Sequence, residues 1–171
     1  MHSHFELFGL APAYALETDA LERSYHEIQA KVHPDRFAHA GDAERRASLQ
    51  WTTRVNEAYR TLKDPVQRAK HLLELHGVDV AFETDTAMPA DFLMQQMELR
   101  ESLEDASAKK DSSRLDLLRK NLNKSRLSLQ QRIAEAIDAK KDYAGAAALV
   151  RKLQFLDKLD REIDLAYETI E

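Results

Sequence analysis

The sequence predicts an all-α protein, built from an N-terminal helical hairpin and a C-terminal antiparallel three-helix bundle. Apolar residues recur at spacings of three, four and seven along most of the 171-residue chain, which is the period of amphipathic helices. No stretch of the sequence alternates apolar and polar residues as a half-buried strand would. Seven of the eight glycines and prolines fall where the helical period breaks, so they mark helix ends.

The first elements lead up to a break at a proline. Residues 5–10 form a short apolar opening, which predicts one helical turn. A longer helix follows, with Thr18 or Asp19 as its capping residue. Because proline disfavours helical geometry in the residue before it, this helix should end near His33.

A second long helix follows the break and runs to about Lys63. His33, Pro34 and Asp35 therefore lie in a loop between two amphipathic helices. If the helices pair antiparallel, the loop is held at one tip of a hairpin. Taken alone, the tripeptide has a simpler interpretation, in which Pro34 only ends a helix and Asp35 only begins a turn.

A third helix begins at Asp64, a capping residue followed by a proline at the first helical position, and Gly77 ends this helix. Residues 77–87 lose the helical period and carry acidic residues and threonines, which is typical of a linker. We therefore expect one domain over residues 1–76, a linker over 77–87 and a second domain over 88–171.

Three helical patterns make up the second domain. The first runs from about Pro89 to Ala106, and the next two carry regularly spaced leucines and isoleucines. Residues 111–113 and Asp142 supply N-caps for the second and third helices. Short connections between such helices predict an antiparallel bundle.

Composition and charge exclude several classes of protein. The chain has no cysteine, so it forms no disulfide and offers no cysteine ligand to zinc or to an iron–sulfur cluster. Residues 1–76 hold 10 basic and 11 acidic residues and the remainder holds 15 and 19, so neither half has the basic field of a nucleic-acid binder. No run approaches the ~20 apolar residues of a membrane span, and no secretion signal opens the chain, so we expect a cytoplasmic location.

The sequence shows no pattern typical of catalysis. It has no phosphate-binding glycine loop and no spacing that pairs a nucleophile with a base. His2 and His4 could share a metal, but without an indicated third ligand a flexible terminus is favoured. We therefore predict no reaction, no cofactor and no metal, and an enzyme with His33 as general base is the least favoured hypothesis.

The helix predicted from Pro89 is apolar on two sides. At ~100° per residue, one face gathers the bundle-facing residues Phe92, Leu99, Leu103 and Ala106. The other side holds three apolar residues and three carboxylates, namely Leu93, Met94, Met97, Glu98, Glu101 and Asp105. Phe155 is likewise out of phase in its own helix. We expect Leu93, Met94, Met97 and Phe155 to form one exposed apolar patch with a charged rim, as in a specific protein contact. The alternative is that the two domains pack together and bury these residues.

The first half resembles a J-domain, the partner module of DnaK-type chaperones. The resemblance rests on His33-Pro34-Asp35 between two helices, on Val55-Asn56-Glu57-Ala58-Tyr59, and on Asp64-Pro65 followed by Arg68-Ala69. The resemblance implies that His33, Pro34 and Asp35 bind the chaperone and speed its ATP hydrolysis. J-domains usually have a basic face on the helix before this loop. Here the helix departs from the family, because it holds only two basic residues and three acidic ones.

A narrower resemblance covers nearly the whole chain, to the HscB type of J-protein. It rests on Phe5-x-Leu7-Phe8-Gly9-Leu10, Leu72-Leu73-x-Leu75-His76-Gly77, Phe92-Leu93-Met94-x-Gln96-Met97-Glu98-Leu99-Arg100-Glu101 and Arg151-Lys152-Leu153-x-Phe155-Leu156-Asp157-Lys158-Leu159. It implies a co-chaperone that brings the iron–sulfur scaffold protein IscU to the DnaK-like chaperone HscA. It also implies an L-shaped fold, and a scaffold-binding patch of Leu93, Met94, Met97, Glu98, Glu101, Asp105 and Phe155. A general J-protein is the runner-up, although the Gly/Phe-rich or zinc-binding segments usual in that type are missing from this sequence.

Overall fold

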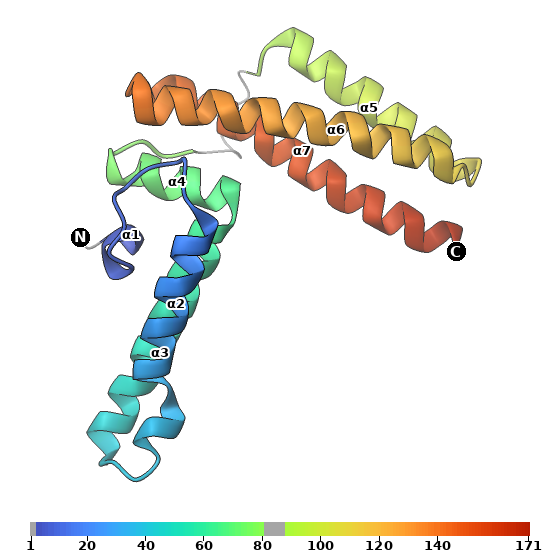
Figure 1. The fold of residues 1–171 in the computed structure, drawn as a ribbon. Helices are drawn as coiled ribbons and strands as arrows, with labels where there is room; N and C mark the ends of the chain where they lie inside the picture. The colour runs from blue at the N-terminus through green and yellow to red at the C-terminus, as the bar shows by residue number, and fades with distance from the viewer. Residues whose placement is uncertain (1–2, 81–87) are drawn as a thin grey trace.

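The computed structural model describes residues 3–80 and 88–171, and every regular element within these ranges is helical. Figure 1 shows two arms set at a steep angle to each other. The N-terminal arm contains α1 (His4–Leu7), α2 (Thr18–Val32), the short turn η1 (Pro34–Phe37), α3 (Asp42–Lys63) and α4 (Pro65–Leu75). The C-terminal arm contains α5 (Ala90–Ala108), α6 (Ser112–Ala134), the π-helical turn η2 (Glu135–Ala139) and α7 (Tyr143–Ile170). The predicted all-α fold is confirmed.

Most helix ends follow from local chemistry that the sequence displays. The helix α2 ends at Val32, so only His33 separates it from Pro34. The Asp64 side chain accepts hydrogen bonds from the backbone N–H groups of Val66 and Gln67, as its predicted capping role requires. The predicted cap of α2 is wrong. Glu17 occupies the N-cap position without a side-chain hydrogen bond, because the helix already begins at Thr18.

Two N-caps in the bundle are confirmed, and one of them explains a glycine inside a helix. Asp111 accepts a hydrogen bond from the N–H of Arg114, and Asp142 accepts one from the N–H of Gly145. A Cβ atom at Gly145 would overlap the Asp142 carboxylate. The glycine therefore leaves room for the capping side chain of its own helix.

The hairpin of α2 and α3 is held by a mixed aromatic and polar contact. The rings of Tyr25 and Tyr59 stack with centroids 4.0 Å apart, and the Tyr25 hydroxyl donates to Asn56 Oδ1 at 2.7 Å. Leu21 and Val55 are fully buried beside them. These contacts fasten α2 to the C-terminal part of α3, and the loop that joins the two helices projects from the molecule (Figure 1).

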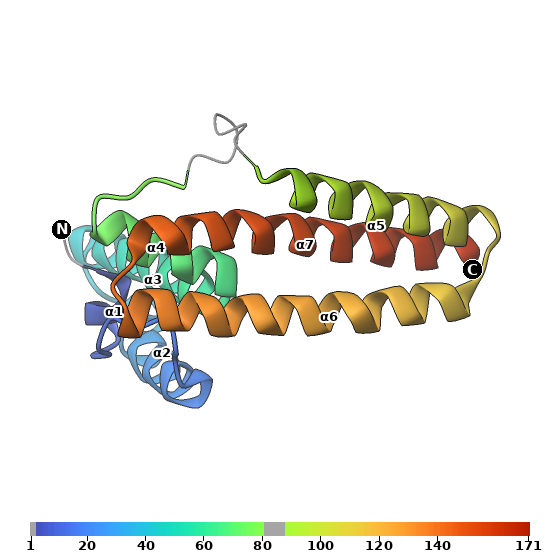
Figure 2. The ribbon, with the colours of Figure 1, turned by 90° about the horizontal axis from the view of Figure 1, so that it is seen from above.

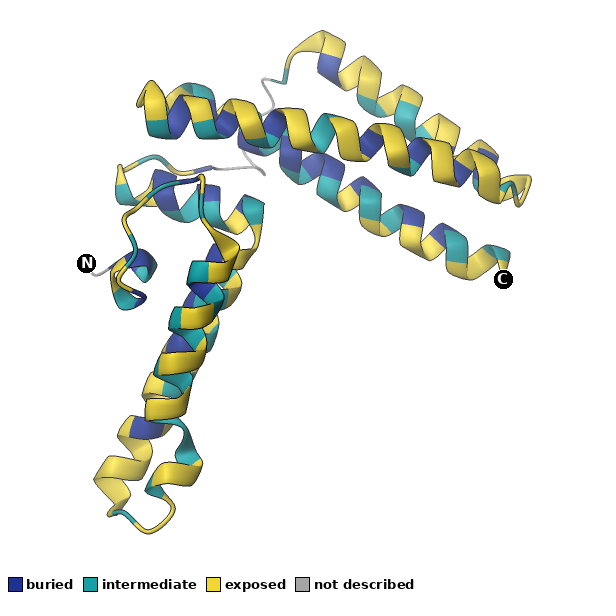
Figure 3. Cartoon of the chain, viewed as in Figure 1, coloured by how far each residue is buried: buried dark blue, intermediate teal, exposed yellow. Residues whose placement is uncertain are grey.

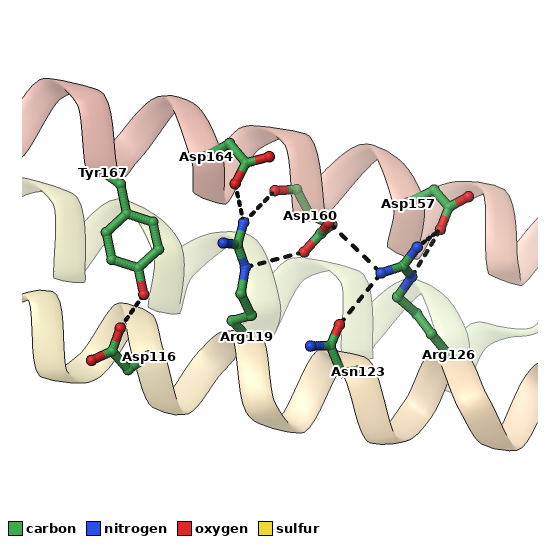
Figure 4. Close-up of polar contacts among 8 residues, drawn as sticks. All are labelled: Asp116, Arg119, Asn123, Arg126, Asp157, Asp160, Asp164 and Tyr167. Atoms are coloured by element: carbon green, nitrogen blue, oxygen red, sulfur yellow. Dashed lines mark hydrogen bonds and ion pairs between the residues drawn. The ribbon is translucent and has the colours of Figure 1, made fainter.

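Ion pairs join α6 to α7 along one side of the bundle (Figure 4). Arg126 Nη2 lies 2.7 Å from Asp157 Oδ1, and Arg119 Nε lies 3.3 Å from Asp160 Oδ1. Arg119 also pairs with Asp164. Because several partly buried charges share one network, they fix the register of the two helices better than isolated surface pairs would.

The two arms meet at the end of the bundle where α6 connects to α7 (Figure 2). Asp138 in η2 accepts hydrogen bonds from the backbone N–H groups of Tyr14, at 2.8 Å, and Ala15, at 3.0 Å. The His76 ring stacks on the Tyr143 ring with centroids 4.0 Å apart. The helix α4 also packs on α7. These contacts set the direction of the hairpin relative to the bundle.

The predicted linker over residues 77–87 lies largely outside the described residues, and so does His2. Within the described part, Gly77 has a φ of +74°, the left-handed conformation that favours glycine after a helix. The division into residues 1–76, 77–87 and 88–171 therefore remains a prediction.

Candidate functional site

The first candidate site is the projecting tip of the hairpin, which is dominated by exposed residues (Figure 3). Here His33 has an extended backbone, and Pro34 opens the turn η1. His33 Nδ1 accepts the backbone N–H of Asp35 at 3.2 Å and lies 3.6 Å from Asp35 Oδ2. The predicted loop at a hairpin tip is therefore confirmed, with the addition that the loop begins as a tight helical turn.

The tip presents its polar groups to solvent. The Asp35 side chain is 93% exposed, and among the described residues no Lys or Arg forms an ion pair with it. Because His33 Nδ1 acts as an acceptor, the neutral imidazole carries its proton on Nε2, which forms no hydrogen bond within the described residues. The tip can therefore offer a carboxylate and a hydrogen-bond donor to a partner.

Two hydroxyl groups hold the backbone behind the tip, and the sequence alone does not predict them. Ser48 and Thr52 of α3 both donate to the carbonyl oxygen of Val32, the last residue of α2. The only signal in the sequence is a serine and a threonine one turn apart on α3, on the side that faces the end of α2.

The second candidate site lies on α5. Leu93 is 44% exposed, Met94 63% and Met97 71%, so these three side chains form an apolar surface, as predicted. Glu98 and Glu101 are also exposed and form no ion pair within the described residues. The alternative, in which the two domains bury this surface, is therefore wrong for Leu93, Met94 and Met97.

The expectation that Phe155 belongs to the exposed surface is wrong, because this residue is only 5% exposed. Its ring meets the ring of Phe92 edge-on at 5.7 Å, and the guanidinium of Arg100 lies 5.5 Å from its centroid. The reason is that α7 packs against α4, α5 and α6, so it buries more than one side. A residue of α7 that lies off the face packed against one helix can therefore be buried against another helix.

Asp105 differs from the other carboxylates of the second site. Its carboxylate lies 3.1 Å from Lys109 Nζ and also pairs with Arg114. The hydrogen bond from Lys109 is the main cause that lowers the pKa of Asp105, and Arg114 adds to it. The negative charge of Asp105 is thus largely compensated, whereas the charges of Glu98 and Glu101 remain available to a partner.

The remaining histidines and helices suggest no further site. His4 and His71 stack at 4.3 Å, and the His4 backbone N–H donates to His71 Nε2 at 3.1 Å. Burial lowers the pKa of His71 to about 4, so the ring is neutral at pH 7. Within residues 3–80 and 88–171, no three His, Cys, Asp or Glu side chains are arranged to hold a metal ion. In the same ranges, no helix is long and apolar enough to cross a membrane.

Comparison with known proteins decides the family. The chain is 48% identical over 169 residues to a co-chaperone protein HscB homolog of Burkholderia thailandensis, covering 99% of this chain and 96% of the relative. It is 46% identical to the homolog of Azoarcus sp., covering 98% and 95%. The chain belongs to the HscB family of co-chaperones. The sequence profile of the HSCB C-terminal oligomerisation domain matches residues 88–164.

Solved structures of HscB proteins share the fold. Chaperone HscB from Vibrio cholerae aligns with a TM-score of 0.88 and 33% identity over 99% of this chain and 100% of that one. Human co-chaperone protein HscB aligns with a TM-score of 0.91 and 26% identity over 96% of this chain and 82% of that one. The two-armed architecture is therefore that of the HscB family.

Proposed function

We propose that this HscB-family chain is a co-chaperone of iron–sulfur cluster assembly. It binds the scaffold protein IscU, delivers it to the DnaK-like chaperone HscA and stimulates ATP hydrolysis by that chaperone. The observation that carries the proposal is the presence of two exposed contact features on separate arms. One is the tip at His33-Pro34-Asp35, and the other is the apolar surface of Leu93, Met94 and Met97.

The tip contacts the chaperone through polar groups that have little freedom left to lose. Pro34 fixes one backbone torsion, and the hydrogen bond from the Asp35 N–H to His33 Nδ1 restrains the turn. A solvated carboxylate such as that of Asp35 forms a charge-assisted pair with an arginine of the partner. Stimulation follows if this contact forms preferentially with the conformation of the chaperone that hydrolyses ATP.

The surface on α5 contacts the scaffold protein. Leu93, Met94 and Met97 supply the apolar centre, and flexible methionines adapt to the shape of a partner. Glu98 and Glu101 supply the charged rim, with Asp105 at its edge. Phe155 supports this site as a buried residue, because its contact with Phe92 holds α5, the helix that carries the surface.

The proposal assigns one task to each domain. Residues 1–76 form the J-domain that stimulates the chaperone, residues 77–87 connect the domains, and residues 88–171 bind the scaffold protein. The chain contributes contacts in the cytoplasm and performs no reaction, so it needs no cofactor.

The proposal is tested by the ATPase rate of purified HscA in single turnover, with the full chain added alone or together with IscU. We expect stimulation by the chain, and further stimulation when IscU is present. A parallel series with the general chaperone DnaK separates the proposal from the runner-up, because a general J-protein would stimulate DnaK equally well. A chain that leaves the HscA rate unchanged would refute the proposal.

A further inference from the structure

At the end of α2, the carbonyl groups of Ala30 and Val32 are among those that lack their usual helical partners. In a helix, the carbonyl of Ala30 would accept the N–H of residue 34, but Pro34 has none. The carbonyl of Val32 would accept the N–H of Arg36, but this N–H donates to the His33 carbonyl at 3.1 Å in the turn η1. The residues just before the tip therefore need hydrogen bonds from elsewhere.

Side chains supply these bonds. The Arg36 guanidinium donates to the Ala30 carbonyl at 3.3 Å. The Val32 carbonyl accepts from Ser48 Oγ at 2.5 Å and from Thr52 Oγ1 at 3.2 Å. Ser48 is only 4% exposed, so its bond is shielded from water. Two donors on one oxygen use both of its lone pairs.

The oxygen that Ser48 and Thr52 hold belongs to the peptide group that joins Val32 to His33. A peptide group is planar, so fixing its oxygen from two directions also fixes the direction in which the chain enters His33. Pro34 follows at once with a fixed φ, which passes this constraint on to Asp35. The orientation of the tip is thus set from α3, although Ser48 and Thr52 lie 16 and 20 residues from Val32 in the sequence.

The neighbouring threonine shows that this arrangement is specific to position. The hydroxyl of Thr53 donates within its own helix, to the Leu49 carbonyl at 3.0 Å. Thr52 instead donates across the hairpin. Thr53 is therefore a matched control for any substitution at Thr52.

We propose that Ser48 and Thr52 are positioning residues for the interaction with the chaperone, acting through the Val32 carbonyl on His33, Pro34 and Asp35. The inference rests on the proposed function, because it concerns the efficiency of the same tip. Without the two hydroxyls, the peptide group before His33 adopts several orientations. Only one of them presents His33 and Asp35 as the folded chain does now.

The expected defect has a characteristic form. When only a fraction of molecules is competent to bind, the apparent affinity falls by that fraction, while the bound complex is unchanged. For a Ser48→Ala, Thr52→Val variant, the concentration that gives half-maximal stimulation of HscA should therefore rise about tenfold, the size expected from losing two hydrogen bonds. The maximal rate of ATP hydrolysis should be unchanged. A role limited to holding the hairpin together would lower the thermal midpoint and leave the half-maximal concentration unchanged.

The experiment measures HscA ATPase against concentration of the full chain, below the melting temperature of every variant. Thr52→Ser keeps the hydroxyl and should behave as wild type, and so should Thr53→Val. In the double variant, the amide signals of His33 and Asp35 should split or broaden in an NMR spectrum. Where the double variant does not fold, Thr52→Val alone, which keeps the Ser48 bond, should show a smaller shift in the same direction.

Two outcomes would overturn the inference while leaving the proposed function intact. One is a folded double variant with the half-maximal concentration of wild type. The other is a defect that Thr53→Val shares. Failure of the proposed function is distinguishable, because then wild type itself gives no stimulation, while the NMR comparison still reports whether the hydroxyls orient the tip.

Discussion

The ring of Phe155 on α7 meets the ring of Phe92 on α5 edge-on, with centroids 5.7 Å apart. Arg100 covers the same ring and pairs with Glu162 of α7 at 3.1 Å. Through Phe92 and Arg100, these contacts fasten α5 to α7. The anchored helix thus buries Phe92 and leaves Leu93, Met94 and Met97 exposed.

Replacing Phe155 by alanine should destabilise the fold. The loss of a buried aromatic side chain should lower the free energy of unfolding by about 3–5 kcal/mol. Urea denaturation followed by circular dichroism measures this change. The matched control is Met97→Ala, which removes an exposed side chain and should change stability by less than about 0.5 kcal/mol. Equal stabilities for the two variants would contradict the burial of Phe155.

Replacing Leu93, Met94 and Met97 together by alanine should weaken binding of IscU. The loss should be about 2–4 kcal/mol, within the range of contact residues that dominate an interface. The thermal midpoint should hardly change, because all three side chains are exposed. Titration calorimetry with purified IscU measures the affinity.

The control for this surface is a second triple variant, in which Leu49, Leu127 and Leu165 become alanine. These leucines are 55–61% exposed but lie on α3, α6 and α7, outside the α5 surface. This variant should bind IscU like wild type. If both triple variants lose affinity equally, the effect comes from general loss of apolar surface and the site is elsewhere.

Stability should fall at acidic pH partly because of His71. Burial lowers its pKa to about 4 in the folded chain, whereas an unfolded histidine titrates near 6.5. Between these values the unfolded chain binds more protons, so the free energy of unfolding rises with pH. The contribution of His71 is therefore complete above pH 6.5 and is lost as the pH falls toward 4.

A His71→Gln variant isolates this contribution, because the amide oxygen still accepts the His4 N–H but cannot be protonated there. The drop in stability between pH 7 and pH 4.5 should be smaller in this variant than in wild type. His39→Gln, at an exposed position, should show the wild-type drop. Identical dependence of stability on pH in wild type and His71→Gln would show that the folded chain does not disfavour protonation of His71.

The sequence predicts most features that depend on neighbouring residues, apart from the cap of α2, and misses those that depend on distant ones. The end of α2 follows from Pro34, and the cap of α4 follows from Asp64, since each acts within four residues. The position of Phe155 depends on α7 packing against three helices, which periodicity in a single helix does not reveal. The bonds from Ser48 and Thr52 to Val32 likewise join residues that only the folded hairpin brings together.

The effect of Asp35→Asn on HscA tests the proposed chaperone contact directly. The Asp35 side chain is almost fully exposed, so its replacement should leave the thermal midpoint of the chain unchanged. IscU binding should also be unchanged, because the apolar surface lies on the other arm. The ATPase rate of HscA, measured with saturating variant, should stay at the basal level that HscA shows alone. An Asp35→Asn chain that stimulates HscA as strongly as wild type would contradict the assignment of the tip as the chaperone contact.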